Sequence, residues 1–267
     1  MPAMPSVSAV VATRNRPSDV HLLLEALAAC DNGSIAEVIL VDDGSDTPLR
    51  VEPATGRFPV RVIRNSTSRG AAASRNLAAK EAVGEVIAFI DDDARPLPGW
   101  CDVLTRELTP ERAAITGRVL PFDHGVVARA RQYRYEVRYA QHAPLSRVRF
   151  FAGGNSAVWT DRFLAADGFP DVVTASDNGL VERLEAVGEH VYFVPALRVA
   201  HRNSKGARIA FREAWRAGRL ADRTSVTVAY GRLTDAARRQ PWRGDPSAAG
   251  LNLTLQAANS LATLLPA

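Results

Sequence analysis

The feature that most constrains this chain is a series of short apolar segments separated by stretches with helical spacing. These segments are rich in β-branched and small side chains, as expected of strands buried on both faces of a parallel sheet. Strands are predicted at residues 7–12, 37–41, 61–64 and 86–90. A helix capped by Ser18 or Asp19 follows the first strand, and another over residues 70–82 precedes the fourth. This alternation predicts βαβ units, and therefore an α/β fold with a mostly parallel central sheet flanked by helices.

Composition excludes several other classes of protein. With 46% apolar and 23% charged residues, the 267-residue chain is not disordered, collagen-like or a coiled coil. A net charge of +4 is too small to indicate nucleic acid as a partner. Cys30 and Cys101 have neither metal-ligand spacing nor the number needed for a disulfide framework. The N-terminus lacks a basic segment, and no stretch approaches the roughly 18 apolar residues of a membrane span. We expect a cytoplasmic protein, at most peripheral at the inner membrane face.

Polar residues follow three of the predicted strands. Thr13 ends the first, Asp42 and Asp43 the second, and a run of three aspartates, residues 91–93, the fourth. Ligands of such sheets bind at the carboxyl ends of the strands. Five carboxylates at neighbouring strand ends repel one another unless cations or hydrogen bonds compensate them. A turn or a solvated strand end explains either group alone, but both together favour a ligand site. G-x-G-x-x-G after the first strand and the P-loop motif do not occur in the sequence.

Seven motifs in order make residues 6–220 resemble family-2 glycosyltransferases with the GT-A fold. The motifs are V-V-A-T-R-N-R-P at 10–17, I-L-V-D-D-G-S at 39–45, R-G-A-A-A-S-R-N at 69–76, G-E-V-I-A-F-I-D-D-D at 84–93, A-G-G-N-S-A-V at 152–158, D-G-F at 167–169 and A-S-D-N-G-L-V-E-R-L at 175–184. The resemblance implies a Rossmann-like GT-A domain with a nucleotide-sugar half at 1–120 and an acceptor half at 121–203. A C-terminal helical extension would cover 204–267.

The resemblance also implies roles for residues of the donor site. Thr13 and Asp43 would hold the nucleobase with Asp42 beside them, and Asp91 would face the ribose or sugar. Arg75 would either assist the pyrophosphate or pair with a nearby carboxylate. Asn155 would contact the sugar, orient a loop or simply sit in a turn. The full set implied for nucleotide-sugar binding is Thr13, Arg14, Asp42, Asp43, Arg75, Asp91, Asp92, Gly154 and Asn155.

The aspartate run also implies a divalent metal. Asp93 of this D-x-D element would hold the cation that bridges the diphosphate. Hard oxygen ligands suit Mg²⁺ or Mn²⁺, which share such sites with water and phosphate. His201, at the end of the apolar run 194–200, is either structural or a further metal ligand.

Asp177 is the candidate general base, which takes the proton of the acceptor hydroxyl as that oxygen attacks the anomeric carbon. It opens a predicted helix at 178–188, so that an ordinary N-cap is the competing interpretation. Ser176 stands where the family usually has Glu, and Gly179 where it often has an acid, which puts the acceptor in doubt more than the chemistry. The motif Q-x-x-R-W does not follow, and this disfavours processive synthesis.

The C-terminal third is predicted to be helical and basic. Arginines recur at three- and four-residue spacing along a helix at 205–223, which is either a solvated face or an interfacial helix for anionic lipid. The tail at 246–267 would dock on the domain or form a homodimer contact. Tyrosines among arginines at 129–149 fit an acceptor-facing element or a surface helix equally well.

Together these features predict an inverting, metal-dependent glycosyltransferase that moves one sugar from a nucleoside diphosphate sugar to a hydroxyl of a small or lipid-linked acceptor. Two alternatives remain open. One is a degenerate module that binds nucleotide sugars without catalysis. The other is a sugar-nucleotide nucleotidyltransferase, although the Gly-rich loop typical of that class does not follow the first strand.

Overall fold

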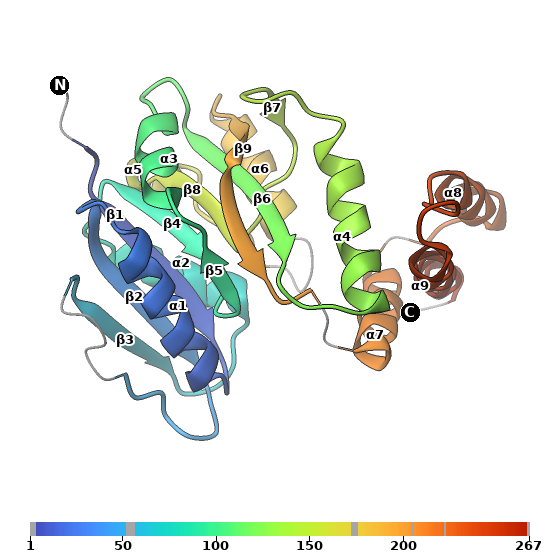
Figure 1. Cartoon of the computed structure of the whole chain (residues 1–267), viewed down its shortest axis with the longest axis horizontal. Coiled ribbons are helices and arrows are strands. Elements are labelled where there is room, and N and C mark those ends of the chain that lie inside the picture. Colours follow the sequence, from blue (N-terminus) through green and yellow to red (C-terminus); the bar gives the residue numbers. More distant parts are fainter. Residues whose placement is uncertain (1–3, 52–56, 172–175, 204–205, 222, 266–267) are drawn as a thin grey trace. The chain divides into compact units, whose positions relative to one another are not determined.

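The computed structural model describes residues 4–51, 57–171, 176–203, 206–221 and 223–265. Its contacts divide the chain into two compact units (Figure 1). The first contains residues 1–120 and 139–200, and the second contains residues 121–138 and 201–267. The segment 121–138 therefore clusters with the C-terminal helices, a grouping that the sequence did not indicate.

The first unit is built on a mixed sheet with strand order β3-β2-β1-β4-β8-β6-β9-β5. The parallel part joins β3 (Val60–Asn65), β2 (Ile35–Asp43), β1 (Val7–Thr13) and β4 (Val86–Ile90). Next to β4 the direction reverses, because β8 (Asn155–Trp159) pairs antiparallel with β4 and with β6 (Ala114–Pro121). Beyond β6 the order continues with β9 (Val191–His201) and β5 (Ala94–Pro96), and the short β7 (Arg147–Val148) also pairs with β9. The predicted α/β sheet is confirmed.

Helices alternate with these strands along the chain and flank the sheet (Figure 1). They are α1 (Pro17–Cys30), α2 (Ala71–Glu81), α3 (Trp100–Glu107), α5 (Thr160–Ala165) and α6 (Ser176–Ala186). The predicted cap of the first helix is wrong: the N-cap is Arg16, without a side-chain bond, and Pro17 occupies the first helical turn. Proline suits that position because its missing N–H has no helical partner there. Helix α6 begins at Ser176, so that Asp177 lies inside its first turn.

An aromatic cluster forms part of the core beneath the sheet. The ring of Phe89, on β4, lies 5.2 Å from that of Phe163 and 5.1 Å from that of Phe169, centroid to centroid. All three side chains are almost completely buried. Full burial of such a side chain stabilises the fold by about 1.5–3 kcal/mol. This packing holds the segment around Phe169 next to the carboxyl end of β4, where the aspartate run begins.

The two cysteines lie together although they are 71 positions apart. The Sγ atoms of Cys30, the last residue of α1, and Cys101, on α3, are 3.7 Å apart, and both thiols are free.

The second unit is helical. It contains α4 (Val126–Tyr139) except for its last residue, together with α7 (Ala207–Leu220), α8 (Val226–Arg238) and α9 (Pro246–Leu264). The predicted basic helix is α7, and its arginines at 208, 212 and 216 are exposed. Helix α9 packs on α7 so closely that a Cβ at Gly218 would lie 2.2 Å from the carbonyl oxygen of Asn259. Within the described residues, every helix is too short or too polar to cross a bilayer.

Candidate active site

The carboxyl ends of β1, β2 and β4 bring the predicted polar residues to one edge of the sheet. In the parallel register Thr13 lies opposite Asp42, and the aspartate run follows β4 directly. The hydroxyl of Thr13 donates to Oδ2 of Asp92 at 2.8 Å. Both side chains are buried, and so is that of Asp93. The register therefore places the predicted site residues of three strands side by side.

Arg16 supplies a cation that this edge needs and that the sequence did not indicate. Its Nη1 donates to Asp92 at 2.8 Å and to Asp93 at 3.1 Å. Burial raises the pKa of Asp92, while Arg16 and the hydroxyl of Thr13 counteract the rise. Arg14, the arginine that the family resemblance assigned to the donor, is exposed in the structure. The two arginines flank Asn15 in the same motif, so that the sequence alone could not distinguish them.

Asp42 is fully buried and its carboxylate is already bound by the protein. Oδ1 accepts the backbone N–H of Ser45 at 2.9 Å, and Oδ2 accepts that of Leu49 at 3.0 Å and a guanidinium hydrogen of Arg64. Burial raises the pKa of Asp42, but these donors outweigh it and the net shift is downward. Asp42 therefore stabilises the loop after β2.

Asp43 is held in the same way by the segment that leads into α2. Its oxygens accept the backbone N–H groups of Arg69 at 2.8 Å and Gly70 at 2.9 Å, and the hydroxyl of Ser68 at 2.7 Å. Asn65 and Ser74 donate as well. Burial raises the pKa of Asp43, but these donors lower it to about 2. Asp43 thus fixes the backbone that precedes α2.

Arg75, on α2, joins two of the predicted site residues. Its Nη2 donates to Oδ1 of Asp91 at 2.7 Å, and its Nη1 lies 3.6 Å from Oδ1 of Asp177. The Arg75 side chain is only 8% exposed, whereas those of Asp91 and Asp177 are 36% and 38% exposed. Of the two roles weighed for Arg75, the structure shows the pairing with carboxylates. A buried guanidinium therefore holds two solvent-accessible carboxylates from different elements.

Gly153 and Gly154 allow this close arrangement. A Cβ at Gly154 would lie 2.2 Å from Oδ2 of Asp91. A Cβ at Gly153 would lie 2.7 Å from both Arg75 Nη1 and Asp177 Oδ1. A side chain at either position would therefore displace the carboxylate or guanidinium groups that it meets. The backbone N–H of Gly153 also donates to Asp177 at 3.2 Å.

Asn155 lies behind these glycines and is completely buried. Its Oδ1 accepts the indole N–H of Trp100 at 2.9 Å, and its Nδ2 donates to the carbonyls of Arg118 and Leu197, both at 2.9 Å. A side chain with no exposure cannot reach a ligand in this structure. Among the roles weighed from the sequence, the geometry supports orientation of the loop, and direct contact with the sugar is not supported.

Asp177 lies in surroundings that disfavour its ionised form. Loss of water raises the pKa of its carboxyl group. The charge of Arg75 and the N–H of Gly153 lower that pKa, and the charge of Asp91 raises it, with a net upward shift. Its carboxylate accepts the N–H of Gly153, which lies on another segment. An ordinary N-cap would instead accept an N–H group from the first turn of its own helix.

His201 ends β9 and is buried. Its Nδ1 lies 3.3 Å from Oδ1 of Asn203. Among the described residues, Asp91, Asp93 and His201 each offer one ligand atom, and these atoms lie within 4.8 Å of one another. Two carboxylates and an imidazole are a donor set that divalent metals such as Mn²⁺ accept.

Comparison with known proteins identifies the family. Residues 8–165 match the family described as "Glycosyl transferase family 2". The chain belongs to glycosyltransferase family 2.

Several curated proteins are related to this family 2 glycosyltransferase. An "Uncharacterized glycosyltransferase" of Haemophilus influenzae is 43% identical over 96 residues, which are 36% of this chain and 32% of that protein. A "Pre-mycofactocin glycosyltransferase" of Mycobacterium tuberculosis is 26% identical over 212 residues, 75% of this chain and 43% of that protein. A "Glucosyl-dolichyl phosphate glucuronosyltransferase" of Haloferax volcanii is 29% identical over 189 residues, 62% of this chain and 59% of that protein. The chain thus spans about a third to three fifths of their lengths.

Solved structures confirm the GT-A fold. The mannosyltransferase PcManGT from Pyrobaculum calidifontis, in complex with GDP-Man and Mn²⁺, superimposes with a TM-score of 0.61 at 17% identity, covering 98% of this chain and 73% of that one. GalNAc-T7 with UDP, GalNAc and Mn²⁺ gives a TM-score of 0.59 at 13% identity, covering 96% and 55%.

One departure of this family member from the usual pattern has a structural reason. At Gly179, where the family often has an acid, a Cβ would lie 2.4 Å from Cγ of Pro170. An acidic side chain therefore does not fit on this turn of α6 unless Pro170 moves. The side chain of the other departing residue, Ser176, lies outside the described part of the structure.

Proposed function

We propose that this chain is an inverting glycosyltransferase. It moves a single sugar from a nucleoside diphosphate sugar to an acceptor hydroxyl, with a divalent metal and with Asp177 as the base. The observation that carries the proposal is the pair of accessible carboxylates, Asp91 and Asp177, held on one buried guanidinium. Asp91 follows the carboxyl end of β4, where ligands of α/β sheets bind, and Asp177 comes from α6.

Asp91, Asp93 and His201 are the residues proposed to hold the metal. The cluster of their ligand atoms and the space that Gly154 leaves beside Asp91 both support this assignment. When bound, Mn²⁺ or Mg²⁺ screens the phosphates and stabilises the departing diphosphate. Arg16 compensates the charges of Asp92 and Asp93, so that the carboxylates remain close together in the free protein.

Asp177 is proposed to accept the proton of the acceptor hydroxyl. An upward-shifted pKa makes its carboxylate a stronger base than an ordinary aspartate. Arg75 and the N–H of Gly153 keep the oxygens in place. Attack from the side opposite the leaving group, assisted by this base, inverts the anomeric centre.

The donor is proposed to bind along the edge formed by Thr13 and the aspartate run. Asp42 and Asp43 each already accept several hydrogen bonds from the protein. Their proposed role is therefore to shape the nucleotide site indirectly, by holding the loops around it in place. Arg14 is exposed beside this edge and is the residue proposed to reach the nucleotide. GDP-Man and UDP in the related structures make a nucleoside diphosphate the ligand class to test.

The acceptor is proposed to be a hydroxyl-bearing small or lipid-linked molecule. The name of the Haloferax relative refers to a dolichyl phosphate, and the arginines of α7 are exposed. A peripheral contact of α7 with anionic lipid follows from this proposal. Sedimentation with phosphatidylglycerol vesicles and with phosphatidylcholine vesicles tests it, and equal binding to both would contradict it.

Binding of UDP, GDP and dTDP, each with and without Mn²⁺, is the first experiment. Calorimetry should detect one nucleotide that binds only with the metal, and Asp93→Ala should abolish this binding. Asp161→Ala, at an exposed aspartate on α5, is the matched control and should bind normally. If no nucleotide binds under either condition, the donor site is assigned wrongly.

Hydrolysis of the corresponding nucleotide sugar then tests the base without knowledge of the acceptor, because water can take the acceptor's place. Asp177→Asn should release nucleoside diphosphate about 10²–10⁴-fold more slowly while it binds the nucleotide normally. Glu182→Gln, at an exposed acid on the same helix, should retain full activity. Nucleotide binding without any hydrolysis in the unmodified protein would support the degenerate binding module instead.

A further inference from the structure

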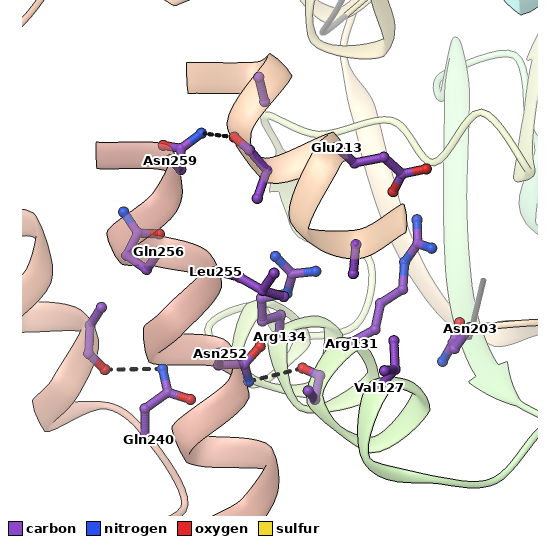
Figure 2. Close-up of a pocket in the computed structure, with 15 residues that line it drawn as sticks. Val127, Arg131, Arg134, Asn203, Glu213, Gln240, Asn252, Leu255, Gln256 and Asn259 are labelled. Atoms are coloured by element: carbon purple, nitrogen blue, oxygen red, sulfur yellow. Dashed lines mark hydrogen bonds between the residues drawn. The ribbon is translucent and has the colours of Figure 1, made fainter. Parts of the chain in front are cut away.

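The helical second unit contains a cavity of about 360 Å³ (Figure 2). Its walls come from α4, α7, α8 and α9, which were not expected from the sequence to enclose a site. Small-molecule sites occupy about 300–1,000 Å³, so that the cavity is large enough for a compact ligand.

Two amide side chains present oxygen atoms there. Asn252 is 4% exposed, and its Nδ2 donates to the carbonyl of Ala130 at 3.0 Å. The Nε2 of Gln240 donates in the same way to the carbonyl of Ala236 at 3.0 Å. Figure 2 shows both bonds at the wall of the cavity. Among the described residues, Oδ1 of Asn252 and Oε1 of Gln240 are buried without a hydrogen-bond partner.

Such unpartnered oxygens are costly in a folded protein. A buried acceptor without a donor costs about 1–3 kcal/mol. Water in the cavity can donate to these oxygens, and a ligand hydroxyl can replace the water at little cost. The cavity therefore selects a ligand that carries hydrogen-bond donors.

Positive charge also gathers at the cavity. Arg131 and Arg134 of α4 and Glu213 of α7 line it. Loss of water and the nearby charges of Arg131 and Arg138 lower the pKa of Arg134, and the charges of Tyr135 and Glu213 compensate this only in part. An anionic group such as a phosphate, whose oxygens can accept from the planar fork of guanidinium donors, would relieve this repulsion.

The remaining wall consists largely of small apolar side chains. Ala210, Ala214 and Ala217 of α7 and Leu255 of α9 line it. Nearby, the tight contact between Gly218 and Asn259 fixes the distance between these two helices. Empty space in a packed unit destabilises it. The alanines are too small to fill the cavity, and polar groups lie beside the space that they leave. This combination indicates a binding site.

We propose that this cavity binds a small anion that carries hydroxyl groups, such as a phosphorylated sugar. Its phosphate binds Arg131 and Arg134, and its hydroxyls donate to Asn252 and Gln240. The same chemistry occurs in a free metabolite and in the headgroup of a phosphoinositide lipid.

Calorimetry in EDTA, which keeps metal from the donor site, tests this proposal with glucose 6-phosphate, glucose and inorganic phosphate. We expect glucose 6-phosphate to bind at least 10-fold more tightly than either part alone. Vesicles with phosphatidylinositol 4-phosphate form a second arm. Binding to these vesicles without binding of the free compound assigns the lipid headgroup as the source, and failure of both arms overturns the proposal.

Three variants locate the ligand. Arg134→Gln should weaken binding at least 10-fold, whereas Arg208→Gln, at an exposed arginine of α7 outside the lining, should change it less than 3-fold. Ala214→Leu fills the cavity and should abolish binding. Equal effects of the two arginine variants, or normal binding by Ala214→Leu, would overturn the proposal. Asp93→Ala should still bind glucose 6-phosphate, so that this proposal and the donor site can fail independently.

Discussion

Replacement of Asp43 by asparagine should reveal how strongly one buried carboxylate supports the loop that leads into α2. Asparagine keeps Oδ1 but replaces Oδ2 by an amide that cannot accept the N–H of Gly70, which donates at 2.9 Å. The hydroxyl of Ser68 can rotate and accept instead, but the backbone N–H cannot. The variant therefore loses the charge and leaves a buried donor without a partner.

The pKa of Asp43 sets the magnitude. A drop from 3.8 to about 2 corresponds to about 2 kcal/mol of stability at 1.36 kcal/mol per pH unit. Because the pKa is lower in the folded state, this contribution is complete above about pH 4 and is lost as the pH falls to about 2. The unpaired N–H of Gly70 adds about 1 kcal/mol. We expect Asp43→Asn to cost about 3 kcal/mol at pH 7.

Urea unfolding of both proteins between pH 7 and pH 2 measures this difference. The gap between them should narrow by about 2 kcal/mol at the acid end, since the unmodified protein then loses the charged interaction. Asp46→Asn, at an exposed position of the same loop, should change stability by less than about 0.5 kcal/mol. A gap that stays constant with pH, or one below about 1 kcal/mol at pH 7, would refute the argument.

Glycine substitutions test the close contacts of the site. In Gly154→Ala the new Cβ lies 2.2 Å from Oδ2 of Asp91, so that the carboxylate must move, and we expect Mn²⁺ binding measured by electron paramagnetic resonance to weaken at least 10-fold. Gly231→Ala, where the added Cβ meets open space, should bind Mn²⁺ normally. Gly179→Ala places a Cβ 2.4 Å from Cγ of Pro170 and should cost about 1–3 kcal/mol in urea unfolding. An increase of about 1 kcal/mol in the free energy of unfolding, which is the helix preference of alanine over glycine, would mean that Pro170 moves aside without cost.

Local patterns in the sequence predicted the parallel part of the sheet well, and long-range contacts explain most of what they missed. A strand such as β4 is a continuous run of apolar residues because both of its faces are buried, and this pattern can be recognised in the sequence alone. Arg16 and Asp92 are 76 positions apart, and no local pattern distinguishes Arg16 from Arg14. The clustering of residues 121–138 with the C-terminal helices likewise depends on tertiary packing.

The same limit applies to individual site residues. The family resemblance implied that Asp91 and Arg75 belong to one donor site, and the two side chains are hydrogen-bonded in the structure. It could not predict that Asn155 would be completely buried against Trp100. A family motif marks a position as constrained, but the constraint can be the fold of the loop as readily as contact with a ligand.

Arg75 connects the two sides of the proposed reaction electrostatically. It lies 2.7 Å from Asp91, which is proposed to bind metal, and 3.6 Å from Asp177, the proposed base. A cation at Asp91 competes with Arg75 for the same carboxylate, so that metal binding should release the guanidinium toward Asp177. Since a closer positive charge favours the ionised carboxylate, Asp177 would then be more fully deprotonated when the metal is bound. Arg75 would therefore make the protonation state of the proposed base depend on metal binding at the donor side.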